Sequence, residues 1–163
     1  MKAPPPVSLR RAARALIVDA EQRVLLFRGD LPDRDPWWFA PGGALEPGET
    51  YAAALVREVM EETALIADAA TLGPPVWTRE SIFTWLGKPE RHVERFFLVR
   101  VVSHDVDTSQ DVGAASVVVR TFRWWTVDDI LGSTERFSPV RLGEHLAALL
   151  RDGAPDQPVT IGD

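Results

Sequence analysis

The chain contains 163 residues, 45% of them hydrophobic, and it has a formal charge of −6 and no cysteine. This length and apolar content predict one domain with a core of its own. The absence of cysteine excludes disulfides, zinc–thiolate sites and thiol nucleophiles. The negative charge disfavours binding of duplex nucleic acid, which usually requires a basic face, and no apolar stretch reaches the ~20 residues of a membrane span. The first residues also lack the apolar core of a secretory signal. We therefore expect a cytoplasmic protein whose partners include neither a membrane nor duplex nucleic acid.

The first forty residues predict two strands joined by a turn. Residues 11–18 begin with a weak alternation of polar and apolar side chains and end in an apolar run, and residues 23–28 are mainly aliphatic. Residues 19–22 between them are typical of a hairpin turn. Three consecutive prolines mark residues 1–9 as a flexible lead-in. Residues 31–36 are charged and bounded by prolines, so we expect a loop there.

A tight loop followed by a helix is predicted next. Proline–glycine pairs at positions 41–42 and 47–48 favour turns. Thr50 suits an N-cap, and Tyr51–Thr63 is rich in good helix formers. Leu55 and Val59, four residues apart, predict the buried side of this helix.

Three glutamates of this helix, Glu58, Glu61 and Glu62, are spaced so that their carboxylates leave one face. Like charges at this spacing repel by roughly 0.2–0.5 kcal/mol per pair, and the helix contains no lysine to compensate. Three converging carboxylates suit a hard divalent cation such as Mg²⁺. A solvated acidic face is the better interpretation of three such glutamates alone, but the preceding glycines, Glu49 and Arg57 favour the cation site.

The second half of the chain predicts three further strands and one more helix. Residues 76–86, 92–102 and 117–127 are rich in β-branched and aromatic side chains. A hairpin tip is expected at residues 87–90, and residues 103–115 are polar enough for a mobile loop.

The last predicted helix spans residues 139–151, with Ser138 as its cap and a leucine-rich apolar side. Gly153 and Pro155 end it, and residues 153–163 are expected to form a flexible tail. Residues 10–152 therefore form the expected single domain.

From Gly43 to Leu65 the chain reads as the pattern GX5EX7REUXEEXGU, where U is aliphatic, with eight of nine specified positions filled. A chance match is on the order of one in a million at typical residue frequencies. On this motif the chain resembles the Nudix hydrolase family. The resemblance implies an α/β (α+β) Nudix fold, an α/β/α sandwich around a central mixed sheet. The one departure is Ala64 in place of glycine, which costs about 1 kcal/mol or less if the helix end keeps a positive φ.

The resemblance also implies the metal ligands. In the family the glutamates that match Glu58, Glu61 and Glu62 bind one to three Mg²⁺ or Mn²⁺ ions, and the backbone carbonyl that matches Gly42 often completes the coordination. None of these four positions is affected by Ala64.

Four residues are predicted to be catalytic on the same grounds: Arg57, Glu58, Glu61 and Glu49. Arg57 is expected to orient the glutamates, although a plain surface salt bridge is its alternative, and Glu49 is expected to support the junction of loop and helix. For the general base we favour Glu61, which can equally be a metal ligand. The acidic residues outside the motif are Glu80, Glu90, Glu94, Asp105, Asp107 and Asp111, of which Asp111 is the second choice.

Substrate contacts are predicted for Arg28 and Trp38. Arg28 ends an aliphatic run and can bind phosphate, with a surface charge as the equal alternative. Trp37 and Trp38 precede the catalytic loop and can stack on a base, although packing against the sheet is as good an interpretation for one of them. No marker of a substrate subclass is present in residues 79–85.

The reaction implied by the resemblance is hydrolysis of a nucleoside diphosphate linked to another group. Metal ions neutralise the diphosphate, and an acidified water attacks phosphorus. A catalytically silent nucleotide-binding module is the alternative, and Ala64 keeps it open. The isomerase branch of the family relies on a cysteine and is set aside. A homodimer is expected by resemblance.

Overall fold

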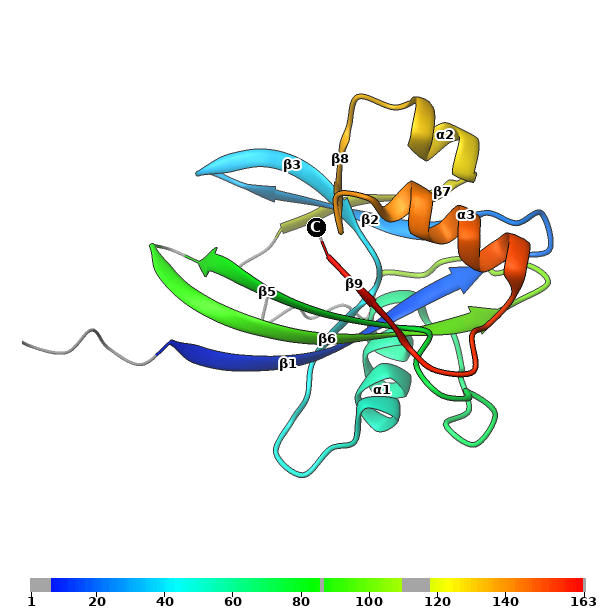
Figure 1. Cartoon of the computed structure of the whole chain (residues 1–163), viewed down its shortest axis with the longest axis horizontal. Coiled ribbons are helices and arrows are strands. Elements are labelled where there is room, and N and C mark those ends of the chain that lie inside the picture. Colours follow the sequence, from blue (N-terminus) through cyan, green and yellow to red (C-terminus); the bar gives the residue numbers. More distant parts are fainter. Residues whose placement is uncertain (1–6, 86, 110–117, 163) are drawn as a thin grey trace, which may run out of the picture.

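One mixed β-sheet, curled so that its two halves face each other, forms the frame of the molecule (Figure 1). The computed structural model describes residues 7–85, 87–109 and 118–162. Its strands are β1 (Ser8–Val18), β2 (Val24–Leu31), β3 (Arg34–Phe39), β4 (Gly42–Ala44), β5 (Trp77–Trp85), β6 (Lys88–Arg100), β7 (Val118–Trp125), β8 (Arg136–Ser138) and β9 (Val159–Ile161). Its helices are α1 (Tyr51–Thr63), α2 (Val127–Gly132) and α3 (Leu142–Asp152). The strand order is β8-β3-β2-β1-β6-β5-β9, with β4 added to β1 and β7 added to β2.

Strand β1 connects the two halves. It pairs in parallel with β6 over all 11 of its residues. Its pairing with β2 is confined to Val18 and Val24, so the halves separate beyond this point. At the far ends of the strands, Arg34 of β3 donates a hydrogen bond of 2.6 Å to the carbonyl of Thr84 in β5. The two halves are therefore joined at both ends.

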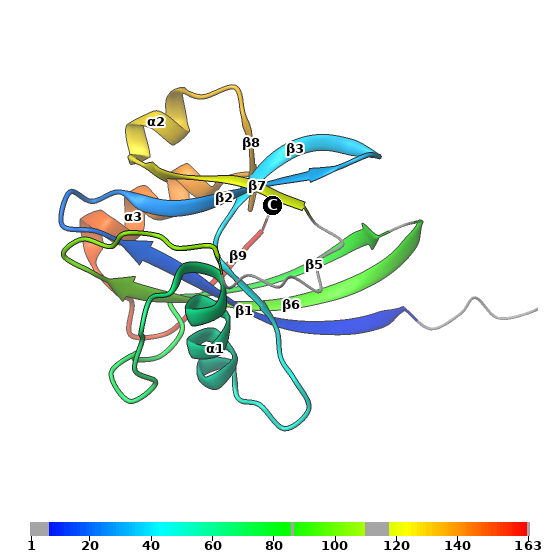
Figure 2. The ribbon, with the colours of Figure 1, turned by 180° about the vertical axis from the view of Figure 1, so that it is seen from behind.

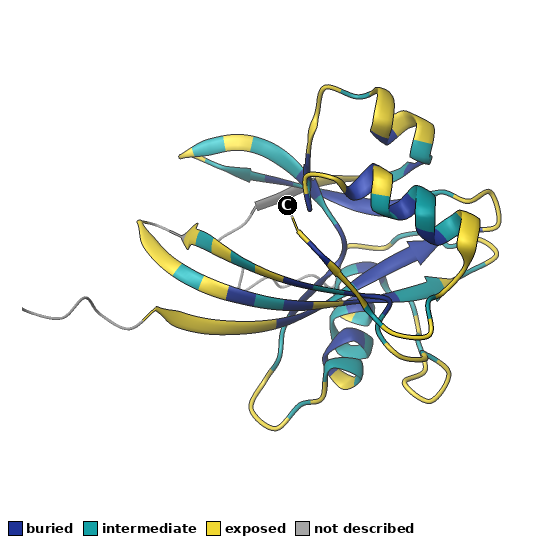
Figure 3. Cartoon of the chain, viewed as in Figure 1, coloured by how far each residue is buried: buried dark blue, intermediate teal, exposed yellow. Residues whose placement is uncertain are grey.

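The side chains of β1 alternate between two cores, as the twofold period of a strand requires. Leu16 packs between the halves with Leu26 and Phe96. Ile17 points to the opposite side and packs with Leu55 of α1. Burial is greatest where the halves meet and decreases toward the free ends of β1, β3 and β5 (Figure 3).

The helices lie on both sides of the half that contains β1. Helix α1 covers its outer side, and α3 covers the core between the halves (Figure 2). This confirms the predicted α/β fold with a mixed sheet between helices. Within the described ranges, no helix is long and apolar enough to cross a membrane.

All five predicted strands are confirmed with shifted ends, as β1, β2, β5, β6 and β7. The turn at residues 19–22 is also confirmed. The buried carboxylate of Asp19 accepts hydrogen bonds from the backbone N–H groups of Glu21 and Arg23 at 3.0 and 2.9 Å. This local pairing closes the turn between β1 and β2.

The loop predicted for residues 31–36 is wrong, because β3 begins at Arg34. Its pairs with β2 include Arg34 and Trp37 but not Pro36, and the register shifts at this point. Pairing with β8 starts only at Trp37. Pro36 is thus tolerated because it lies at an irregularity where no ladder hydrogen bond is needed.

The last predicted helix begins later than expected. Ser138 is the final residue of β8, and Arg141 precedes α3 without a side-chain cap. Helix α2 was not predicted, and it begins with a capping box between Thr126 and Asp129. The hydroxyl of Ser138 is used elsewhere, as described below.

The flexible tail predicted for residues 153–163 is also wrong in its second part. Val159–Ile161 forms β9, which pairs in parallel with β5, and Ile161 is 3% exposed. At the other end, Ser8 and Leu9 belong to β1 rather than to a lead-in, while residues 1–6 lie outside the described residues. The ordered domain therefore extends beyond the predicted boundaries of 10–152.

Candidate active site

Helix α1 has the predicted start and end. The hydroxyl of Thr50 accepts a hydrogen bond from the backbone N–H of Ala53 at 3.1 Å. Ala64 ends the helix with φ 59° and ψ 18°, and its N–H donates to the carbonyl of Met60 at 2.9 Å. Alanine therefore keeps the left-handed conformation that favours glycine at this helix end.

Arg57 joins the loop to the helix. Its Nε and Nη2 donate to the two carboxylate oxygens of Glu49 at 2.8 and 2.9 Å, and its Nη1 donates to Glu58 at 2.7 Å. The same side chain reaches the carbonyl of Ala44 at 3.1 Å and lies 3.6 Å from the carboxylate of Glu61. A planar guanidinium suits this fork of contacts better than a lysine ammonium. Arg57 thus lies where an orienting residue belongs.

The charge of Arg57 also sets the ionisation of its partner. The hydrogen bond from Arg57 lowers the pKa of Glu49 to about 2, helped by the backbone N–H of Glu46. The same hydrogen bond raises the pKa of Arg57 above its ordinary value. Glu49 is therefore fully ionised at neutral pH and acts as a fixed anchor rather than as an acid or base.

Glu58 and Glu62 lie against Gly42 and Gly43, two positions where only glycine fits. Gly42 has φ +135°, and a Cβ there would lie 2.0 Å from the carbonyl oxygen of Ala13. A Cβ on Gly43 would lie 2.5 Å from the carboxylate of Glu58. Glu62 accepts a hydrogen bond from the N–H of Gly42 at 2.9 Å. The missing side chains thus make room for two helix carboxylates against the loop backbone.

The donor atoms in this region fit a hard divalent cation. Glu58, Glu61 and Glu62 supply carboxylate oxygens on one helix face, and the side chain of Glu61 is 49% exposed. In the described parts of the chain, no three acidic or histidine side chains already converge on one point. Mg²⁺ usually keeps several waters and takes one or two carboxylates. The chemistry of the donors therefore suits Mg²⁺ or Mn²⁺ without a closed protein cage.

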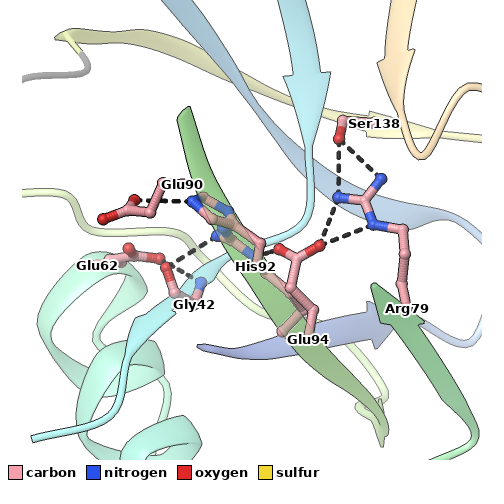
Figure 4. Close-up of polar contacts among 8 residues, drawn as sticks. Gly42, Glu62, Arg79, Glu90, His92, Glu94 and Ser138 are labelled. Atoms are coloured by element: carbon pink, nitrogen blue, oxygen red, sulfur yellow. Dashed lines mark hydrogen bonds and ion pairs between the residues drawn. The ribbon is translucent and has the colours of Figure 1, made fainter. Parts of the chain in front are cut away.

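A second polar cluster, buried between the halves, was not foreseen (Figure 4). Glu94 is 1% exposed. One of its oxygens accepts from Nε of Arg14 at 2.8 Å, and the other accepts from Nε and Nη2 of Arg79 at 2.7 and 2.5 Å. The guanidinium of Arg79 also donates to the hydroxyl of Ser138 at 3.1 and 3.2 Å. We call these four residues the buried ion network. Each partner comes from a different strand, so no sequence pattern could have shown it.

This network excludes Glu94 as the general base. Burial raises the pKa of Glu94, but the charges and hydrogen bonds of Arg14 and Arg79 outweigh it and hold the pKa at about 2. A base needs a pKa near the working pH and a free oxygen. Both oxygens of Glu94 are occupied, so its role is structural or positional.

The other acidic candidates lie in different settings. Glu80 is paired with Arg91 at 2.5 Å on the surface, and Glu90 is bonded to His92 at 2.9 Å. Asp105 and Asp107 are exposed, and the N–H of Asp107 donates to the carbonyl of Thr63 at 3.2 Å, beside the end of α1. Asp111 lies outside the described residues. Glu61 remains the predicted base.

Trp38 does not lie where a stacking residue belongs. It is 5% exposed, its ring packs edge-to-face on Trp125 at 5.0 Å, and its Nε1 donates to Glu135 at 3.2 Å. The predicted stacking role is therefore corrected to a core role. Trp37 is half-buried and faces the ring of Phe39 at 5.9 Å, so the more accessible ring belongs to Trp37.

Arg28 lies on β2, paired in register with Trp38. It is half-buried, and its Nε is shielded from water without a hydrogen-bond partner among the described residues. Buried donors are normally paired. The phosphate contact of Arg28 therefore stays a prediction, and its unpaired Nε is the feature of the structure that bears on it.

Comparisons with known proteins identify relatives of one kind. The family model of the NUDIX domain matches residues 8–145. Human 8-oxo-dGDP phosphatase NUDT18 is 35% identical over 95 residues, which cover 53% of this chain and 28% of that protein. An uncharacterised Nudix hydrolase, YvcI of Bacillus subtilis, is 27% identical over 114 residues, covering 70% of this chain and 65% of that protein. The chain thus spans less than two thirds of either relative.

Solved structures show the same fold. A MutT protein from Methanosarcina mazei Go1 superimposes with a TM-score of 0.69 at 21% identity, covering 93% of this chain and 100% of that one. An Ap4A hydrolase of C. elegans gives a TM-score of 0.61 at 20% identity, covering 88% and 98%. Together with the family match over most of the chain, these findings establish that the chain belongs to the Nudix hydrolase family.

Proposed function

We propose that this chain is a metal-dependent hydrolase that cleaves the diphosphate linkage of a nucleoside diphosphate joined to another group, with water attacking phosphorus. The observation that carries the proposal is the carboxylate face of α1, held against the Gly42–Gly43 backbone and oriented by Arg57. Relatives named as an 8-oxo-dGDP phosphatase, an RNA pyrophosphohydrolase and an Ap4A hydrolase support a nucleotide as substrate.

Each residue of the site has a distinct part in this proposal. Glu58, Glu61, Glu62 and the carbonyl of Gly42 would hold Mg²⁺ or Mn²⁺. When bound, the cation would neutralise the diphosphate and acidify water. Arg57 fixes the carboxylate of Glu58 by a 2.7 Å hydrogen bond, so this oxygen has little freedom to rotate.

Glu61 is the proposed base. It is the exposed one of the three helix glutamates, since Glu58 and Glu62 are half-buried. Its carboxylate lies 3.6 Å from Arg57. A loosely held carboxylate beside solvent can accept a proton from an attacking water. Arg28 is the proposed phosphate contact on the substrate side.

The alternative, a silent nucleotide-binding module, rested on Ala64. Because Ala64 keeps the left-handed helix end, the observation that favoured this alternative loses its weight. The predicted cytoplasmic location and homodimer, and a small nucleotide rather than duplex nucleic acid as partner, belong to the same proposal.

The test is phosphate release, with a coupled phosphatase, from nucleoside triphosphates, 8-oxo-dGDP, ADP-ribose, dinucleoside polyphosphates and nucleotide sugars. Each substrate is incubated with Mg²⁺ or Mn²⁺ at mildly alkaline pH, with EDTA as control. Turnover that disappears with EDTA and is confined to one substrate class supports the proposal and names the substrate. No turnover of any substrate, with nucleotide binding retained, would establish the binding module instead.

A further inference from the structure

The peptide units on either side of Gly42 are held by side chains of two different elements. Its N–H donates to Glu62 at 2.9 Å, and its carbonyl accepts from Nη1 of Arg14 at 3.2 Å. One partner belongs to α1 and the other to β1. Gly42 also pairs in register with Arg14 between β4 and β1. The residue whose carbonyl is a proposed metal ligand is thus fixed by a helix carboxylate and by an arginine.

Such fixing is needed because glycine has no conformational preference of its own. Gly42 adopts φ +135°, which L side chains rarely adopt, and glycine visits many backbone conformations at similar free energy. Without contacts on both sides, the carbonyl could turn away from the carboxylates of α1. The contacts around Gly42 therefore decide where its oxygen points.

Arg14 can direct this carbonyl because Glu94 fixes its guanidinium plane. Nε of Arg14 donates to Glu94 at 2.8 Å while Nη1 of the same rigid group donates to Gly42. Glu94 is in turn held by Arg79, which donates to Ser138 of β8 (Figure 4). The side chain of Arg14 is 16% exposed and that of Glu94 is 2% exposed. The orientation of Arg14 is therefore set by contacts with β5, β6 and β8, outside the motif.

Stability alone is a weak reason for such a network. Replacing buried ion pairs by apolar residues of similar volume is often neutral or stabilising, because charges lose hydration on burial. Here the carboxylate of Glu94 is bonded on both oxygens by guanidinium groups that belong to two different strands. A role in fixing the Gly42 carbonyl accounts for an arginine where an apolar side chain would pack.

We propose that Arg14 and Glu94 are positioning residues that fix the orientation of the Gly42 carbonyl, the oxygen that would complete the metal site beside the carboxylates of α1. The metal-related part of this inference rests on the proposed function, whereas the backbone part does not. Residues that orient metal ligands from the second layer typically change metal affinity or activity by about 10–100-fold when replaced.

The experiment compares Arg14→Lys and Arg14→Met with the full-length wild type. Lysine keeps the charge but has no rigid fork to bond Glu94 and Gly42 together. Asp19→Asn is the matched control, because Asp19 is 3% exposed and paired with Arg23 but has no contact with Gly42. Hydrogen exchange of the Gly42 amide, relative to amides in the middle of α1, and Mn²⁺ affinity by calorimetry are measured at a temperature where all variants are folded.

We expect both Arg14 variants to exchange the Gly42 amide faster and to bind Mn²⁺ about tenfold or more weakly. Their kcat should fall at fixed Mn²⁺ with the nucleotide KM nearly unchanged, and raised Mn²⁺ should restore part of the activity. Asp19→Asn should lower the melting temperature but leave the exchange of the Gly42 amide and the Mn²⁺ affinity unchanged.

Wild-type exchange at Gly42 and wild-type Mn²⁺ affinity in the Arg14 variants, with only a lower melting temperature, would show that the network is merely structural. If the wild type neither binds Mn²⁺ nor hydrolyses any nucleotide, the proposed function fails, while the exchange of the Gly42 amide still decides the backbone part. Glu94→Gln, if it folds, should reproduce the effects of Arg14→Met.

Discussion

The cluster around Arg57 and the buried ion network differ in how their central residue is bonded. Arg57 lies within ion-pair distance of four carboxylates, those of Glu46, Glu49, Glu58 and Glu61. Glu94, in contrast, faces two guanidinium groups. The first cluster has a surplus of negative charge at a partly exposed surface, whereas the second holds a buried carboxylate bonded on both oxygens. Several solvent-accessible carboxylates close together can bind a cation. A buried carboxylate with both oxygens hydrogen-bonded cannot also accept a proton from water or bind a metal ion. This difference separates residues proposed to act on substrate from residues that hold them in place.

The largest expected effect tests the exposed side of this comparison. Glu61→Gln should reduce kcat by about 10²–10⁴-fold, the usual contribution of a positioned base. Its stability should stay the same or rise slightly, because one like-charge repulsion on the helix is removed. Initial rates and urea unfolding measure both quantities. Glu144→Gln, on the exposed side of α3, is the control and should change neither, and an unchanged kcat in Glu61→Gln would remove Glu61 from the proposed chemistry.

The second prediction tests the buried side through pH. Because the pKa of Glu94 is about 2 in the folded chain and near 4.5 ordinarily, its ionised form stabilises the fold. This contribution is complete above pH 4.5 and is lost as pH falls toward and through 2, with a size on the order of 3 kcal/mol. Urea unfolding at several pH values between 7 and 2 measures it.

Glu49, whose pKa is also about 2, loses its contribution in the same pH window. Glu94→Gln and Glu49→Gln therefore have to be compared with the wild type. The acid-dependent loss of stability should shrink clearly in Glu94→Gln. An unchanged pH profile in that variant would mean that the buried ion network does not stabilise the ionised carboxylate.

The two regions also differ in how far the sequence reveals them. Arg57 bonds residues that are 8 and 1 positions away, so spacing along one loop and one helix predicts the contacts. Glu94 bonds residues that are 80 and 15 positions away, and only the strand order brings them together. The same reason explains the misplaced roles of Ser138 and Trp38, because a serine can cap a helix or bond a distant arginine.

Predicted strands follow the same rule. The long strands β1, β2 and β5 to β7, which are rich in aliphatic, β-branched or aromatic residues, are predicted correctly. Short strands that exist only because a neighbour pairs with them, β8 and β9, are not. Local propensity specifies long elements, while pairing partners decide the short ones.

A third prediction, with a smaller expected effect, tests whether the contacts of Arg57 depend on the N-terminal cap of α1. Thr50→Ala removes the N-cap hydrogen bond of α1 and should lower the free energy of unfolding by about 1 kcal/mol. Because Glu49 and Tyr51 adjoin the cap, a modest loss of Mn²⁺ affinity should accompany it. Thr126→Ala in the capping box of α2 is the matched control, with a similar loss of stability and unchanged Mn²⁺ affinity. Equal Mn²⁺ affinities in both variants would show that the cluster does not need its cap.

The smallest expected effect concerns Ala64, where the motif departs from its pattern. Alanine is held at φ 59°, a conformation that costs L-residues free energy and glycine little. Ala64→Gly should therefore raise the free energy of unfolding by up to about 1 kcal/mol. Gln22→Gly, at φ 62° in the turn between β1 and β2, is a matched control with a similar gain. Urea unfolding and initial rates decide the outcome: a gain in stability without a change in kcat would show that Ala64 only strains the helix end, and a rise in kcat confined to Ala64→Gly would show that this strain reaches the carboxylates of α1.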